Sequence, residues 1–191
     1  MSVEELVLKN RSYRGYDRSY RFTRDHLAKY VDIARLCPSS VNKQPFKYYL
    51  AWDEEKVTLI QRNTKWARAL PELTLPHKGK EPTAFIVICQ DKQIDKDLNR
   101  YQRDLGIVAQ SMLLKAAEED LGGCMIGNFN AEGIKEALSL PENISPLLIV
   151  AFGKPDEKIV LTSVKDSVNY YRDENDVHYV PKRSLESELL D

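Results

Sequence analysis

Two arginines and a serine lie close together near the start of the chain, in the stretch KNRSYRGY (9–16). Arg11 and Arg14 are three residues apart, and Ser12 lies between them. A guanidinium group offers paired donors that suit a phosphate or the carbonyl of a heteroaromatic ring, and a serine hydroxyl adds one more hydrogen bond. The same spacing is common on solvated helix ends, so this stretch predicts an anion site only in combination with other residues.

A second candidate is the polar loop PSSVNKQP (38–45), which has a proline at each end. The prolines restrict the backbone, and the residues between them supply donors and acceptors. The polar residues are Ser39, Ser40, Asn42 and Gln44. A flavin needs neighbours of this kind, because its pyrimidine edge alternates acceptors with one donor. An ordinary polar turn explains the composition equally well.

A basic pair follows a proline near the other end of the chain, in YVPKRSL (179–185). Lys182 and Arg183 are either a solvated surface pair or an anchor for an anion. Together with Arg11 and Arg14 they could hold one phosphate, although spacing alone does not show that these segments meet.

Common motifs for nucleotide binding, metal binding and nucleophilic catalysis are absent from the sequence, and no catalytic constellation is visible. It contains no GxGxxG, GxxxxGK[ST], HExxH or GxSxG. His26, His77 and His178 lack metal-ligand spacing, and we expect each on the surface or fully hydrogen-bonded in the interior. We therefore predict no metal site and no catalytic side chain, so that in an enzyme a cofactor would supply the chemistry.

The charge and composition exclude several classes of protein. Of 191 residues, 42% are hydrophobic and 30% are charged, which is usual for one globular domain. The net charge of −1 argues against nucleic-acid binding, and no apolar run approaches the roughly 20 residues that cross a membrane. The acidic first ten residues do not resemble a secretory signal, and three widely spaced cysteines favour a reducing compartment. We expect a cytoplasmic protein.

The hydrophobic pattern predicts the elements that position these residues. Helices are predicted over 23–36, 95–121 and 131–139, and one more after Asp53, with Thr23, Asp53 and Asn130 as N-caps and Gly122-Gly123 ending the longest. Strands are predicted at 46–52, 84–90 and 146–153, with CMIGNF (124–129) as a short strand or turn. Residues 71–83 contain three prolines and form a loop.

These elements predict one α+β domain over residues 1–191, with helices around a sheet of about four strands. The helix 95–121 is apolar nearly all round, which is typical of the middle of a fold or an interface. The tail, about 154–191, is polar with scattered aromatics and a short helix in RSLESELL (183–190). We expect the tail to pack on the body or on a second copy.

Taken together, four stretches resemble the nitroreductase family of FMN-dependent oxidoreductases, in the family's order. They are NRSYRGY (10–16), ARLCPSSVNKQPFKYYL (34–50), DLGIVAQSMLLKAAEEDLGGCMIGNF (104–129) and LLIVAFGKP (147–155). The resemblance implies a sandwich with a central antiparallel-type sheet flanked by helices. It also implies an intertwined homodimer with FMN at the subunit interface and the tail packed on the partner subunit.

The resemblance further implies which residues bind FMN. They are Arg11, Ser12, Arg14, Pro38, Ser39, Ser40, Asn42, Gln44, Met125, Ile126, Gly127, Asn128, Lys182 and Arg183. Two positions depart from the family's pattern: Asn10 stands where many members have arginine, and Gly127 stands where an acidic residue is usual. The segment 61–83, a source of substrate-pocket walls in the family, is short here, with Lys65 or Trp66 as candidates to cover the pocket.

The implied activity is ping-pong hydride transfer from NADPH or NADH, through FMN, to nitroaromatic, quinone or related small-molecule acceptors. Three alternatives stay open. One is a flavin enzyme of the same fold with another reaction, such as reductive dehalogenation or dehydrogenation. The others are an FMN-binding protein without turnover and a dimeric interaction module that has lost the cofactor. The sequence identifies neither the physiological substrate nor the preferred nucleotide.

Overall fold

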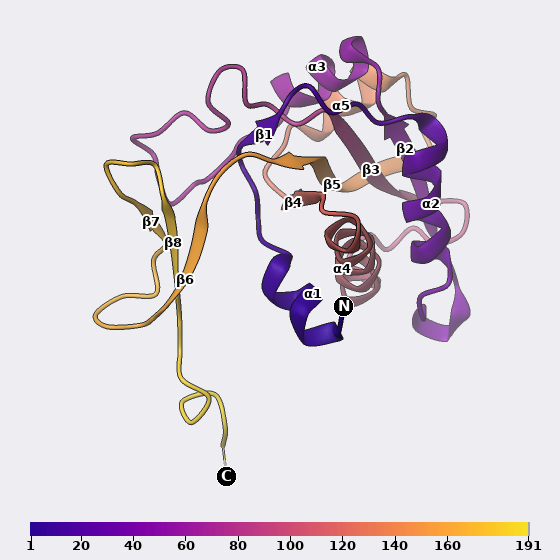
Figure 1. Ribbon diagram of the computed structural model, residues 1–191. Helices are drawn as coiled ribbons and strands as arrows, with labels where there is room; N and C mark the ends of the chain where they lie inside the picture. The colour runs from indigo at the N-terminus through magenta and orange to yellow at the C-terminus, as the bar shows by residue number, and fades with distance from the viewer. Residues whose placement is uncertain (191) are drawn as a thin grey trace.

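The computed structural model of the protein describes residues 1–190 and has a five-stranded antiparallel sheet at its centre (Figure 1). The strands are β1 (Tyr16–Asp17), β2 (Phe46–Ala51), β3 (Ala84–Asp91), β4 (Gly122–Ile126) and β5 (Ile144–Pro155). Their order is β1-β5-β3-β2, and β4 pairs with β5 beside β1. The observed sheet therefore has one strand more than the roughly four that the sequence predicted.

Strand β3 is buried along its whole length, as its continuous apolar run predicted. Its side chains alternate between two cores. Ile86 and Ile88 join one core, and Phe85 and Val87 join the other. A strand that is apolar on both faces needs helices on both sides of the sheet, which is the arrangement observed.

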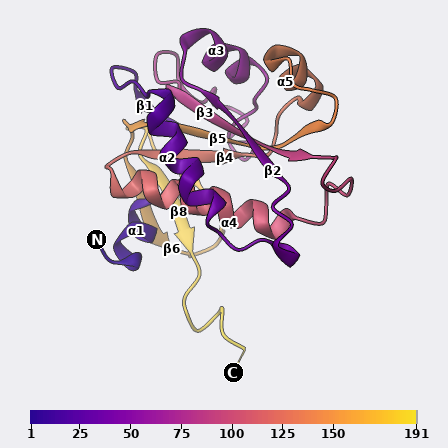
Figure 2. The same ribbon diagram turned by 90° about the vertical axis from the view of Figure 1, so that its right-hand side faces the viewer.

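Helices cover both faces of this sheet and make the α+β sandwich that was predicted. The helices are α1 (Val3–Lys9), which packs against α4, and α2 (Arg24–Arg35), α3 (Glu54–Arg62), α4 (Gln102–Glu118) and α5 (Ala131–Leu138). Helices α2 and α4 pack on one face, and α3 and α5 pack on the other (Figure 2). The three predicted N-caps are confirmed: Thr23 accepts from the His26 N–H, Asp53 from the Lys56 N–H and Asn130 from the Gly133 N–H.

The long helix α4 is shorter than predicted at both ends. Before it, Asp95 and Asp97 accept the backbone N–H groups two residues later, at 2.9 and 3.0 Å, so that side chains compete with the helix for these donors. After it, Asp120 takes the left-handed conformation with φ 60°. The predicted C-cap at Gly122-Gly123 is wrong, because both glycines belong to β4.

Two parts of the fold were not predicted. Helix α1 begins with a capping box between Ser2 and Glu5. The tail folds into a three-stranded sheet of β6 (Ile159–Ser163), β7 (Tyr171–Arg172) and β8 (His178–Lys182), which stands beside the main body in Figure 1. The predicted helix in RSLESELL is wrong, since residues 185–188 form only a bend and a turn.

None of the helices within residues 1–190 is both long enough and apolar enough to cross a membrane.

Candidate functional site

A cleft of about 400 Å³ lies where α4, β4, the tail sheet and the N-terminal arm (residues 10–15, between α1 and β1) meet. Five of its lining residues belong to the predicted set: Arg11, Ser12, Arg14, Met125 and Lys182. The other lining residues were not in that set: Val7, Asn10, Gln110, Leu113, Ile159, Tyr170, His178 and Val180. The fold therefore brings the two cationic segments together, which the sequence alone did not show.

The arm that carries Arg11 and Arg14 lies across the start of β4. The Tyr13 N–H donates to the Gly123 carbonyl at 3.0 Å, and Ser12 and Gly123 form a parallel bridge. A Cβ on Gly122 would lie 2.4 Å from the Tyr13 ring, so glycine is required for this close approach. The glycine pair thus positions the arm instead of ending a helix.

The two arginines of the arm differ in their surroundings. Arg11 turns back onto α1, where Nε donates to the Asn10 carbonyl at 2.6 Å and Nη2 to the Val7 carbonyl at 2.5 Å. Arg14 forms its two side-chain hydrogen bonds through Nη1 alone, one to the Ser12 carbonyl at 3.1 Å and one to His178 at 3.3 Å. Within the described part of the chain, two nitrogens of Arg14, Nε and Nη2, therefore stay free for a ligand, whereas Arg11 keeps only Nη1 free.

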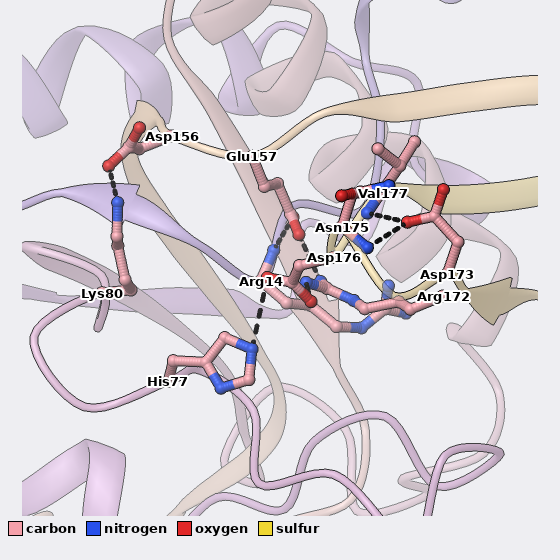
Figure 3. Close-up of polar contacts among 10 residues, drawn as sticks. All are labelled: Arg14, His77, Lys80, Asp156, Glu157, Arg172, Asp173, Asn175, Asp176 and Val177. Carbon is pink, nitrogen blue, oxygen red and sulfur yellow. Dashed lines mark hydrogen bonds and ion pairs between the residues drawn. The ribbon is translucent and has the colours of Figure 1, made fainter.

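The buried carboxylate of Glu157 joins the arm to the tail sheet, as Figure 3 shows. The side chains of Glu157 and Arg172 are each 3% exposed and bind one another. The same carboxylate accepts the backbone N–H of Arg14, and Arg172 Nη1 also lies 2.7 Å from Asp176. Breaking a buried pair by removing one partner is costly, so this contact fixes the tail sheet against the arm.

His178 contacts the Arg14 side chain beside this ion pair and is 1% exposed. Burial, together with the charges of Arg14 and Arg172, lowers the pKa of His178 to about 4. Its Nδ1 has no hydrogen-bond partner among residues 1–190. The expectation that every histidine is on the surface or fully hydrogen-bonded is therefore wrong for His178.

Alternate residues of β8 face the cleft, as the period of a strand requires. His178, Val180 and Lys182 line it. Arg183 does not, and instead lies 3.6 Å from Glu188. The alternation HxVxK before the predicted basic pair was a signal that could have identified His178 from the sequence.

The polar loop 38–45 borders a second, smaller cavity of about 230 Å³. Pro38, Ser39 and Gln44 help to line this cavity. Asp104 of α4 holds the loop, because its carboxylate accepts the Ser39 hydroxyl at 2.9 Å and the Ser40 N–H at 2.7 Å. Asn42 accepts from the Gln44 side chain at 3.0 Å.

Three residues of this loop adopt the left-handed conformation, in which a β-branched residue is strained. Val41 has φ 47° and is 85% exposed, and Asn42 and Gln44 have φ 52° and 49°. Such strain is frequently found at ligand-binding sites.

The remaining predicted residues line neither cavity. Ile126 is buried in the core under α3 and α5. Gly127 and Asn128 are exposed after β4, and the Asn128 carbonyl accepts the Lys65 N–H at 2.8 Å. Lys65 and Trp66, the candidates for covering the pocket, also lie outside the residues that line the two cavities.

The larger cleft has three cationic side chains, Arg11, Arg14 and Lys182, beside apolar walls. Among the lining residues that the structure describes, none is an Asp or a Glu. The charge and shape of this cleft suit an anionic, partly apolar small molecule. The sequence profile of the Nitroreductase family matches residues 7–154. The chain belongs to the nitroreductase family.

Individual relatives agree with this family. A Methanothermobacter thermautotrophicus protein, provisionally named NADH dehydrogenase/NAD(P)H nitroreductase, is 26% identical over 82% of this chain and 79% of its own. The crystal structure of a nitroreductase family protein from Clostridium difficile 630 superposes with a TM-score of 0.65 at 26% identity, covering 82% of this chain and 86% of that one. An FMN-dependent nitroreductase from Clostridium difficile R20291 has the same TM-score and identity, with 82% and 89% covered.

Proposed function

We propose that this protein is an FMN-dependent oxidoreductase that uses NADPH or NADH to reduce nitroaromatic, quinone or related small-molecule acceptors. The observation that carries the proposal is the convergence of Arg11, Arg14 and Lys182 on one cleft that also has apolar walls. FMN has the matching chemistry, because it joins a phosphate dianion to a flat, largely apolar ring.

The lining residues of the cleft fit such a molecule. Its volume of about 400 Å³ is within the roughly 300–1,000 Å³ usual for cofactor sites. Guanidinium and ammonium groups bind phosphate, and the Ser12 hydroxyl adds a donor. Met125 and Leu113 offer apolar surface for a ring. Because none of the lining residues that the structure describes is an Asp or a Glu, none of these side chains repels a phosphate.

Bound FMN would supply the redox chemistry, taking up two electrons and a proton as hydride from the nucleotide and passing them to the acceptor. The protein's own groups bind and orient the reactants. Arg11 or Arg14 would stabilise negative charge on the pyrimidine edge, since a cation near that edge favours the anionic reduced form. No described side chain of the cleft is required to act as an acid or a base.

The proposed site includes a second copy of the chain. The strained loop of residues 38–45 exposes Asn42 and Gln44, yet within one protomer it opens onto the separate 230 Å³ cavity. We infer that this loop completes the cleft of a partner subunit in a homodimer. Pro38, Ser39, Ser40, Asn42 and Gln44 would then contact the flavin across the interface.

Steady-state turnover tests this function. Protein reconstituted with FMN should oxidise NADPH or NADH in the presence of a quinone or a nitroaromatic, with the parallel-line kinetics of a ping-pong mechanism. Turnover that depends on FMN supports the proposal. FMN binding without oxidation of either nucleotide with any acceptor would contradict it and indicate a flavin-binding protein without turnover.

A further inference from the structure

Side chains of the tail hold Arg14 in one position at the edge of the cleft. Its Cζ lies 5.0 Å from the centre of the Tyr170 ring, and its Nη1 lies 3.3 Å from Nε2 of His178. The rings of Tyr170 and His178 are themselves 5.1 Å apart. Below the side chain, the backbone N–H of Arg14 donates to Glu157. Arg14 is therefore fixed at both its backbone and its guanidinium group by residues from the far end of the chain.

The contact with Arg14 defines the protonation state of His178. A guanidinium group has donors and no acceptor, so Nε2 of His178 must be the acceptor. The proton of the neutral ring then lies on Nδ1, the atom that has no partner among the described residues. This tautomer leaves a buried donor unpaired, and the ring gains in exchange one hydrogen bond from a charged group.

The surrounding charges oppose a second proton on this ring. Arg14 and Arg172 are the cations beside it. Glu157 is committed to Arg172 and to the Arg14 backbone, and Asp176 is bound to Arg172 at 2.7 Å. Each nearby carboxylate is thus paired, and none within the described residues is hydrogen-bonded to the His178 ring. The charge of Asp176 favours a second proton, but its effect is smaller than that of the two cations.

We propose that His178 is a positioning residue for Arg14. Its neutral imidazole accepts Nη1–H, and Nε and Nη2 of Arg14 are thereby presented to the phosphate of the ligand. The proposal rests on the proposed function, since the ligand concerned is FMN. The tail sheet thus has a role in phosphate recognition. His178 acts on the phosphate through Arg14 and does not touch the phosphate itself.

Binding of two flavins to the FMN-free protein tests this role, because riboflavin is FMN without the phosphate. We expect His178→Phe to weaken FMN binding by about tenfold, the effect of one hydrogen bond to a charged group, and to leave riboflavin binding unchanged. His178→Gln, which retains an acceptor near the place of Nε2, should restore FMN binding. Equal losses for the two flavins would overturn the proposal, because they indicate a structural role only.

A double-mutant cycle with Arg14→Ala separates action through Arg14 from direct action. In the Arg14→Ala protein, His178→Phe should cause no further loss of FMN affinity. A further tenfold loss there would overturn the proposal.

The ring nitrogens of His178 give a test that needs no flavin. In ¹⁵N NMR spectra of the FMN-free wild-type protein at pH 6, we expect a neutral ring protonated on Nδ1. A ring protonated on Nε2, or on both nitrogens, would overturn the proposal. If the wild-type protein binds no FMN, the proposed function fails, whereas this spectrum still decides whether Arg14 and His178 are in contact.

Discussion

Arg14 is the residue on which the proposed cofactor site depends most. It differs from Arg11 because its side chain is held by a ring and an imidazole instead of by the carbonyls of α1. A guanidinium group held in this way loses little conformational entropy when it binds an anion.

Replacing Arg14 with alanine should weaken FMN binding by about 1.5–3 kcal/mol, the contribution of a hydrogen bond to a charged group. Quenching of flavin fluorescence on titration of the FMN-free protein measures the affinity. Arg24→Ala is a matched control, because Arg24 is an exposed arginine of α2 that is not among the residues lining the cleft. An unchanged affinity of the Arg14→Ala protein would remove this residue from the site.

His178 gives the protein a specific dependence on pH. The pKa of His178 in the folded protein is about 4, below the ordinary value of 6.5. Between pH 6.5 and about pH 4, His178 is therefore protonated in the unfolded chain and neutral in the folded chain. The contribution of the neutral ring to stability is complete above pH 6.5 and is lost as the pH falls towards 4. The loss is up to about 3 kcal/mol.

Urea unfolding of the wild-type and His178→Gln proteins between pH 4.5 and 7 tests this dependence. Carboxylates also lower the stability in acid, but they are common to both proteins and cancel in the difference. The wild type should lose about 2–3 kcal/mol more than the variant over this range. Parallel curves for the two proteins would show that His178 titrates normally.

At the scale of elements, the pairing of β4 with β5 positions both the arm and the cleft. A Cβ on Gly123 would lie 2.0 Å from the Ala151 carbonyl oxygen of β5, and a backbone atom there cannot move aside. Gly123→Ala should therefore lower the free energy of unfolding by about 3 kcal/mol.

Gly106→Ala is the matched control for this substitution. Gly106 lies in α4, and a Cβ there would meet no atom within 4 Å. Alanine should raise the stability by about 0.5–1 kcal/mol, because glycine is unfavourable inside a helix. Chemical denaturation measures both changes, and equal effects of the two substitutions would contradict the tight approach of β4 and β5.

Helix α4 also determines the conformation of the polar loop, through the carboxylate of Asp104. Asp104→Ala should lower stability by about 1.5–3 kcal/mol and accelerate hydrogen exchange in residues 36–45, since Ser39 and Ser40 lose a charged acceptor. Glu136→Ala, at an exposed position of α5, is the control. Unchanged exchange in the loop would mean that Asp104 does not hold it.

Much of the element pattern could be predicted from sequence because its signals are local. Caps and hydrophobic periods identified α2, α3 and α5, and the apolar run identified β3. The start of α4 was missed because the side chains of Asp95 and Asp97 bind the backbone, a competition that periodicity does not reveal.

The site was predicted less completely than the elements, since its assembly depends on distant parts of the chain. In the tail, β6 pairs in parallel with β8, and Glu157 binds both Arg172 of that sheet and the Arg14 backbone of the arm. No local pattern encodes such contacts. The sequence therefore predicted Arg11, Arg14 and Lys182 as cations of interest but not Tyr170 or His178.

At the scale of the whole molecule, the proposed site requires two chains. Within one protomer, the strained loop 38–45 lines a cavity that is separate from the cationic cleft. We expect sedimentation equilibrium to give twice the mass of the chain at micromolar concentration, both with and without FMN. A monomer that binds FMN and turns over would contradict the proposed contribution of the partner subunit.

The visible absorption spectrum, recorded without oxygen before and after addition of NADPH or NADH, tests the central claim most directly. We expect a flavin spectrum for the protein incubated with FMN, and bleaching of that spectrum by at least one of the two nucleotides. Absence of a protein-bound flavin spectrum after incubation with FMN would contradict the site. A bound flavin that neither nucleotide bleaches would contradict the proposed reaction.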